Sequence, residues 1–282
     1  MEASRTLKDG KNERTSKNTV PMDAGTTPSI ANGIKRKTNI KSIDALMDGG
    51  LSTNTITTVA GLQGTGKTLV LLSMAVLSEH DCVLYSPKLS YGEIKSRIAK
   101  ICIALGIDMK DIHYDITESL WMIVKLKTHV IRIAGHGTTA VATTGNFIAN
   151  VKALVDSGAA NMVLVDSPCK IAYGINDREE SELLKSLDAI AARTNTPVIV
   201  TVLVKRNAAK DRADLKEWLS QHVLEYSSHI VFVNGWPEVK GGNAILRLLA
   251  LTYDSITGKW TCEKGQLKMK HVFGNHSIEY RS

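Results

Sequence analysis

The stretch TITTVAGLQGTGKTLVLLSMAVLSE, residues 55–79, decides the fold. Its first seven residues are rich in β-branched side chains and end in glycine, which is typical of a buried strand. Residues 67–79 are apolar almost throughout and predict a buried helix. Between them, residues 61–68 fit the pattern G-x-x-x-x-G-K-[ST] at every position. A strand before this pattern and a helix after it indicate a phosphate-binding loop.

Each residue type in this loop has a physical role. Glycines let the backbone curl so that its N–H groups point at phosphate oxygens, and the start of the helix adds a favourable dipole. We expect Lys67 to reach the β- and γ-phosphates and Thr68 to offer its hydroxyl to Mg²⁺. The cofactors predicted on this basis are ATP and Mg²⁺, and the predicted nucleotide-binding residues are Gly61, Leu62, Gln63, Gly64, Thr65, Gly66, Lys67 and Thr68.

A second motif places an acid at the end of a buried strand. The run Met162-Val163-Leu164-Val165 is apolar and is followed by Asp166. A carboxylate in this position is expected to hold Mg²⁺ or a water bound to it, so Thr68 and Asp166 are the predicted metal ligands. An acid that merely ends a strand is the alternative interpretation.

Strands and helices alternate along most of the chain, which predicts βαβ units and a parallel sheet. The expected strands are apolar throughout, so both faces of the sheet should be covered by helices. We expect strands at 55–61, 82–86, 130–133, 161–167, 197–204 and 229–234, and helices at 40–47, 67–79, 92–106, 146–158 and 178–195.

The pattern changes from residue 244 onward. Short strand-like runs are separated by turns at Thr257-Gly258 and at Lys264-Gly265, which indicates antiparallel strands. The predicted fold class is therefore α/β, with a mostly parallel central sheet, helices on both faces and an antiparallel C-terminal extension.

The positive charge is concentrated at the N-terminus. Residues 1–41 hold nine basic and four acidic residues, which is five of the seven net positive charges. We expect residues 1–38 to form a disordered basic tail and residues 39–282 to form the folded core. A basic tail favours polyanions such as nucleic acid, and a solvated leader is the alternative. The N-terminus lacks the apolar region of a secretory signal, and no run approaches the ~18 apolar residues of a membrane span, so we expect a cytoplasmic protein.

From Thr38 to its end, the chain resembles the RecA-like core of hexameric replicative helicases, of both the DnaB type and the plasmid RepA type. The resemblance is carried by GLQGTGKT (61–68), VLYSPKLSYGEIKSRI (83–98), the block 161–207 and LKMKHVFGN (267–275). It implies a bacterial, plasmid or phage ATPase that forms a hexameric ring and moves on single-stranded DNA during replication. It also implies a catalytic set of Lys67, Asp166 and a trans-acting Lys270 that reaches the nucleotide of a neighbouring subunit.

The chain departs from this family at three positions. The glutamate that activates the attacking water corresponds to Lys88, and a charged lysine cannot accept a proton. The polar sensor at the end of the strand after Asp166 corresponds to Leu203. The arginine expected two residues after Lys270 corresponds to Val272.

Substitutes exist for two of these groups. Glu93 is a candidate base, and Lys268 and Arg247 are candidate trans-acting cations. Because these matches are weaker than that of the phosphate loop, nucleotide binding is better supported than fast hydrolysis.

Single-stranded DNA is the expected macromolecular partner. In RecA-like rings DNA lies against the loops that follow the acidic strand and the next strand, here 170–180 and 205–214. The second loop suits a phosphate backbone, although Asp211 and Asp214 dilute its charge and a solvated loop is the alternative. The predicted DNA-binding residues are Lys205, Arg206, Lys210 and Arg212.

Three functions remain open at this level. The first is a DnaB/RepA-like DNA helicase that hydrolyses ATP. The second is an ATP-binding recombination mediator or helicase accessory protein in which ATP hydrolysis has become inefficient. The third is a small-molecule P-loop kinase. Lys88 and Leu203 favour the second, whereas the long-range resemblance favours the first, which is the leading prediction from the sequence.

Overall fold

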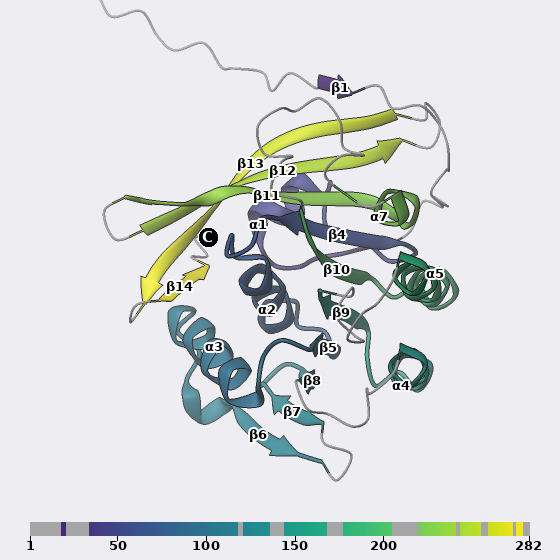
Figure 1. The fold of residues 1–282 in the computed structure, drawn as a ribbon. Coiled ribbons are helices and arrows are strands. Elements are labelled where there is room, and N and C mark those ends of the chain that lie inside the picture. Colours follow the sequence, from purple (N-terminus) through teal and green to yellow (C-terminus); the bar gives the residue numbers. More distant parts are fainter. Residues whose placement is uncertain are drawn as a thin grey trace, which may run out of the picture.

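We describe the protein from a computed structural model over residues 18–20, 34–117, 121–135, 144–167, 177–204, 219, 221–240, 243–254, 259–272 and 275–278, called the described residues below. Within them, twelve strands form one sheet in the order β1-β13-β12-β11-β4-β10-β9-β5-β8-β7-β6, and β14 pairs with β13 (Figure 1). The strands are β1 (Asn18–Val20), β4 (Ile56–Gly61), β5 (Cys82–Ser86), β6 (His113–Ile116), β7 (Met122–Lys125), β8 (Val130–Gly135), β9 (Met162–Asp166), β10 (Val198–Leu203), β11 (Ser227–Lys240), β12 (Asn243–Asp254), β13 (Lys259–Val272) and β14 (Asn275–Ile278).

The centre of the sheet is parallel, as the sequence predicts. Strands β8, β5, β9, β10, β4 and β11 lie side by side and run in one direction. The C-terminal strands β12, β13 and β14 continue the sheet in antiparallel pairs, which confirms the predicted extension. The opposite edge is also antiparallel, because β6 and β7 form a hairpin beside β8 that the sequence analysis did not predict.

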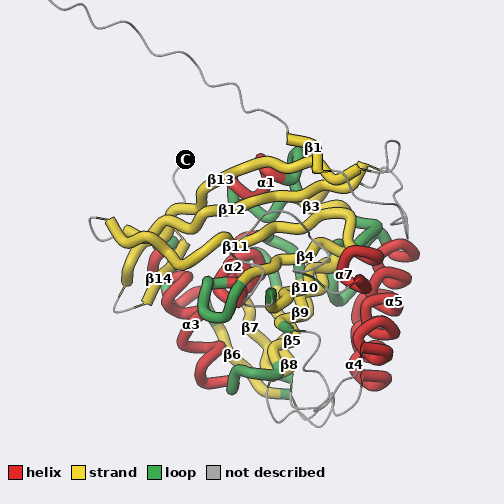
Figure 2. The backbone as a smooth tube through the Cα atoms, turned by 45° about the horizontal axis from the view of Figure 1, so that its top comes forward, coloured by secondary structure: helices red, strands yellow, loops and turns green. Residues whose placement is uncertain are grey.

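Helices cover both faces of the sheet, which confirms the predicted fold class. The helices are α1 (Lys41–Leu46), α2 (Lys67–Leu77), α3 (Tyr91–Ala104), α4 (Thr144–Asp156), α5 (Asp177–Thr194) and α7 (Gln221–Tyr226), with a 3₁₀ turn η1 (Met109–Asp111). Helices α2 and α3 lie on one side of the sheet, and α4, α5 and α7 lie on the other (Figures 1 and 2). No described helix is long and apolar enough to cross a membrane.

Two apolar cores follow from the alternation of side chains along each strand. In β4, Val59 packs into the core beneath α2 and α3, whereas Ile56 and Ala60 pack into the core beneath α4 and α5. Each core contains large side chains with no exposed surface, such as Leu71 in the first and Phe147 in the second. This double burial explains why the central strands are apolar throughout.

One predicted turn is wrong. The sequence suggested a break at Lys264-Gly265, but β13 runs without interruption through both residues, which pair with Leu249 and Leu248 of β12. A turn there would remove the β13 partner from the first half of β12. A single glycine is accommodated within a strand at modest cost, so the longer pairing prevails.

The folded core begins earlier than residue 39. Strand β2 (Lys35–Arg36) pairs with β3 (Leu51–Ser52) in a small second sheet. Thr38 is fully buried, and its N–H and hydroxyl both donate to Asp44 Oδ1 at 2.8 Å. Residues 18–20, inside the predicted tail, form β1 at the edge of β13. Both segments are too short to show periodicity in the sequence, and the rest of 1–33 lies outside the described residues.

Candidate nucleotide-binding site

The phosphate-binding loop lies between β4 and α2, as predicted. Gly61 ends β4 so close to its neighbours that a Cβ there would lie 2.8 Å from Thr65 Oγ1 and 3.0 Å from the Val233 carbonyl. Gly64 and Gly66 have φ angles of 78° and 98°, which side chains rarely adopt. The glycines of the motif are therefore required by the path of the backbone itself.

Lys67 is buried at the first position of α2. Its ammonium donates to the carbonyl oxygens of Gly61 at 2.8 Å and Leu62 at 2.7 Å. The pKa of Lys67 is lowered to about 8, mainly by burial and also by the Lys88 ammonium, while the Asp166 carboxylate opposes both effects. The loop therefore holds a desolvated cation, which favours the binding of an anion.

Asp166 is surrounded by hydroxyl groups because of the strand order. It ends β9, which lies between β5 and β10, and Thr201 of β10 is its direct neighbour in the pairing register. Thr201 donates to Asp166 Oδ1 at 2.7 Å, and Ser86 of β5 donates to Oδ2 at 3.1 Å. Thr68 of α2 donates to Oδ2 at 3.0 Å, so the phosphate loop and the acidic strand meet directly.

Lys88 lies on the other side of Asp166 from the loop. It follows β5 in a turn that has Pro87 at its second position and is closed by the Leu89 N–H bonding to the Ser86 carbonyl at 3.4 Å. The Lys88 ammonium donates to Ser167 Oγ at 3.0 Å. Two ammonium groups and one carboxylate thus meet at the carboxyl edge of the sheet, which is electropositive as a result.

These groups fit a nucleoside triphosphate with Mg²⁺. The first turn of α2 has no side-chain cap at Gly66, and phosphate oxygens are suitable partners for such N–H groups. Thr68 and Asp166 supply the hydroxyl and carboxylate oxygens that Mg²⁺ prefers. The described residues contain no cluster of three or more His, Cys, Asp or Glu side chains that could hold a metal ion. The metal would therefore take its remaining ligands from phosphate oxygens and water.

Among the other residues singled out in the sequence, the structure describes Leu203, Glu93 and Lys270. Leu203 ends β10 beside Gly61 and is exposed, so an apolar side chain does occupy the edge next to the loop. Glu93 accepts hydrogen bonds from the backbone and the hydroxyl of Ser90, both at 2.8 Å, and caps α3. Lys270 lies in β13, where its backbone pairs with Asn243 of β12 on one side and Ser277 of β14 on the other. The predicted DNA contacts, Lys205, Arg206, Lys210 and Arg212, lie outside the described residues.

Sequence reasoning missed three hydroxyl residues of the site, namely Ser86, Ser167 and Thr201. A signal existed for Thr201, which is the one polar residue within the apolar run Val198–Leu203. Ser86 and Ser167 each lie at or just after the carboxyl end of a parallel strand, where sites of α/β folds form. Their roles depend on which strands are neighbours, and the sequence does not give that order.

The fold and the site define a RecA-like P-loop ATPase. The model of the family described as ATPase: KaiC matches residues 36–231, more than half of the chain, so the protein belongs to this family. Among curated proteins, none matches the chain in sequence. The match ends within β11, so the strand of Lys270 lies beyond it, and it does not distinguish a DnaB/RepA-type helicase from other ATPases of this fold.

Proposed function

We propose that this protein binds Mg²⁺·ATP between the loop 61–68 and Asp166, holds it tightly and hydrolyses it slowly. The observation that carries the proposal is the direct contact of Thr68 with Asp166 beside the buried Lys67, together with Lys88, which bonds to Ser167 and stands where a catalytic carboxylate is expected. The first three residues provide what phosphate and magnesium binding require. Lys88 adds a second cation, which strengthens binding and contributes no base.

Slow hydrolysis follows from the chemistry of the described residues. A general base typically contributes ~10²–10⁴-fold to a rate. Asp166 already accepts hydrogen bonds from three hydroxyl groups and is assigned to the metal. Glu93, the substitute base that the sequence suggests, is engaged in capping α3. Neither carboxylate is free to activate the attacking water.

Single-stranded DNA is the partner we propose, in a cytoplasmic setting of a bacterium, plasmid or phage. The Val204 N–H donates to the Gly61 carbonyl at 3.1 Å, so the residue that precedes the basic segment 205–214 in the sequence lies beside the phosphate loop. This contact supports a coupling between nucleotide and DNA. Lys205, Arg206, Lys210 and Arg212 would track the phosphate backbone, which makes binding tolerant of sequence and steeply dependent on salt.

A homo-oligomer, in the form of a hexameric ring, completes the proposal. In such a ring Lys270 would reach the nucleotide of the neighbouring subunit. Within this assembly the lead role is an ATP-dependent accessory or mediator protein acting on single-stranded DNA. A DnaB/RepA-type replicative helicase is the second candidate, supported by the order and spacing of the sequence blocks, and it requires a fast turnover that Lys88 opposes.

The test is a paired measurement of ATP affinity and steady-state turnover, with and without single-stranded DNA. We expect tight Mg²⁺-dependent binding and slow turnover in both conditions. Fast turnover stimulated by DNA would favour the helicase, and the absence of ATP binding would refute the proposed site. Charge reversal at Lys205 and Arg206 should weaken DNA binding for all sequences alike. If deletion of residues 1–33 removes DNA binding and the reversal does not, the tail is the DNA contact.

A further inference from the structure

The residue after Asp166 links Lys88 to the carboxylate of the site. Ser167 Oγ accepts the hydrogen bond of the Lys88 ammonium at 3.0 Å. The Ser167 N–H donates to Thr201 Oγ1 at 2.8 Å, and that hydroxyl in turn donates to Asp166 Oδ1 at 2.7 Å. Lys88 is therefore connected to Asp166 through two residues, Ser167 and Thr201.

Ser167 adopts a backbone conformation that serine rarely adopts. Its φ angle is 61°, in the left-handed region, and its side chain is buried. Such a residue costs free energy, and strained residues of this kind are concentrated at functional sites. The conformation turns the hydroxyl of Ser167 toward β5, which pairs with β9, and so toward Lys88.

The side of the site on which Lys88 lies determines which phosphate its ammonium can bind. The strand order β4-β10-β9-β5 puts the loop at the end of β4 and Lys88 beyond β5, with Asp166 between them. Phosphates held by the loop would lie on one side of Asp166, so the outermost phosphate would be the one directed toward Lys88. An ammonium has three donors, and the bond to Ser167 uses one of them. Two donors remain for phosphate oxygens.

We propose that Ser167 is a positioning residue that directs Lys88 at the γ-phosphate and thereby makes the site prefer ATP over ADP. This inference rests on the proposed nucleotide site. Ser167 does not contact the nucleotide in this account. It fixes the ammonium of Lys88, and Thr201 fixes the turn that carries Ser167.

The variants Ser167→Ala and Ser167→Gly test the proposal by their ATP and ADP affinities. Both remove the hydroxyl, and a hydrogen bond to a charged group is strong enough that its loss should reduce ATP affinity about tenfold. ADP affinity should stay within about twofold of the wild-type value, since ADP lacks the γ-phosphate that Lys88 is proposed to bind. Glycine also relieves the strain at φ 61°, so Ser167→Gly keeps the fold even if Ser167→Ala does not.

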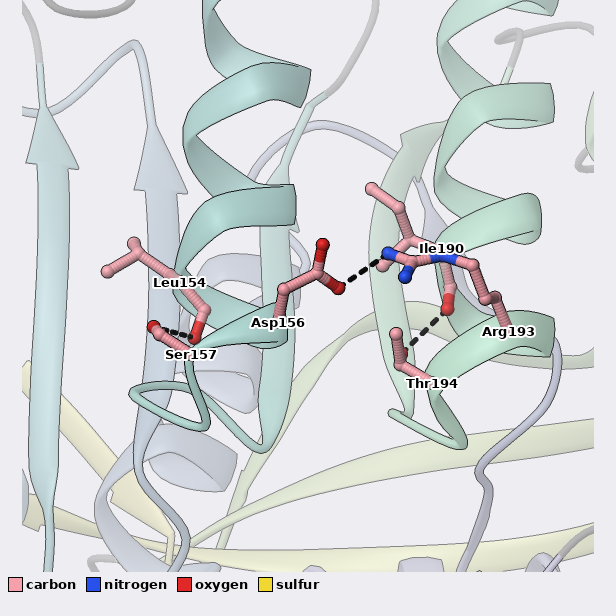
Figure 3. Close-up of polar contacts among 6 residues, drawn as sticks. All are labelled: Leu154, Asp156, Ser157, Ile190, Arg193 and Thr194. Carbon is pink, nitrogen blue, oxygen red and sulfur yellow. Dashed lines mark hydrogen bonds and ion pairs between the residues drawn. The ribbon is translucent and has the colours of Figure 1, made fainter.

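Lys88→Met should show the same selective loss, and the double variant Lys88→Met/Ser167→Gly should lose no more than Lys88→Met alone. Ser157→Ala is the matched control. Its hydroxyl donates to the Leu154 carbonyl at 3.1 Å, at the end of α4 that precedes the start of β9 (Figure 3). That end lies at the amino edge of the parallel strands, away from Ser167, so both affinities should be unchanged.

The outcomes separate this inference from the proposed function. If the wild type binds neither nucleotide, the site itself is refuted. If the wild type binds both, but the Ser167 variants keep its ATP preference, the positioning role is refuted and the site stands. Equal losses of ATP and ADP in Ser167→Gly would show a merely structural role and would also overturn the inference.

Discussion

Thr68 Oγ1 lies 3.0 Å from Asp166 Oδ2, although the two residues are 98 positions apart in the sequence. The contact joins the start of α2 to the end of β9 across the intervening strand β10. It brings a hydroxyl and a carboxylate to the carboxyl edge of the sheet, beside the loop that curls around Lys67. The remaining hydrogen bonds of the site, from Ser86 and Thr201, hold the carboxylate in this position.

Removal of the loop cation should abolish nucleotide binding. In Lys67→Ala we expect ATP affinity to fall below detection while the fold is kept, because the ammonium that faces the β- and γ-phosphates is lost. Calorimetric titration and a thermal melt are the two measurements. Lys152→Ala, on an exposed position of α4, is the matched control and should bind as the wild type does. Unchanged affinity in Lys67→Ala would contradict the site.

Nucleotide affinity should fall as the pH rises from 7 to 9. Burial and the nearby Lys88 lower the pKa of Lys67 to about 8, so the ammonium is charged below this pH and neutral above it. Phosphate binding requires the charged form, which gives the sign of the effect. In Lys88→Met one cause of the shift is absent, so the fall should move to higher pH. A profile that is flat over this range in the wild type would contradict the assignment of Lys67.

Loss of the carboxylate should remove the part of the affinity that depends on magnesium. Asp166→Asn keeps the shape of the side chain and loses the charge that the metal needs. We expect the wild type to bind ATP more tightly in Mg²⁺ than in EDTA and the variant to bind equally in both. A variant that retains the full effect of Mg²⁺ would place the metal elsewhere.

Stability should depend on the apolar cores and little on the surface. Phe147 is fully buried in the core beneath α4 and α5, with its ring centroid 4.7 Å from that of Tyr85. Phe147→Ala should lower the free energy of unfolding by about 3–5 kcal/mol. The pair Arg193–Asp156, 2.6 Å apart and half exposed, links the ends of α4 and α5 (Figure 3). Arg193→Ala should cost no more than about 1 kcal/mol in denaturant unfolding. Equal costs would contradict this division.

Sequence alone predicted the elements whose patterns are strong and local. The helix and strand on either side of the loop, and the strand that ends in Asp166, lie within a residue or two of their predicted positions. The continuity of β13 was missed because it depends on pairing with β12, which no local pattern reports. The hairpin of β6 and β7 was missed because its strands are four residues long and mostly exposed in β6.

The candidate site shows the same division. The motif identifies Lys67 and Thr68 from their own sequence context, and Asp166 follows from the apolar run before it. Ser86 and Thr201 contact Asp166 because β5 and β10 flank β9, and this order results from the tertiary fold. Serine rarely adopts a left-handed backbone conformation, so the sequence does not predict one at Ser167. Its hydrogen bond with Lys88 is therefore visible only in the structure.

The central claim is that this site holds ATP and lacks a base because Lys88 replaces a carboxylate. The most direct test is the steady-state ATP turnover of the wild type and Lys88→Glu, measured side by side on single-stranded DNA. We predict slow turnover in the wild type and a rise in Lys88→Glu toward the ~10²–10⁴-fold that a general base contributes. A fast wild type whose turnover is unchanged or slowed by Lys88→Glu would contradict the account, since another residue would then be the base.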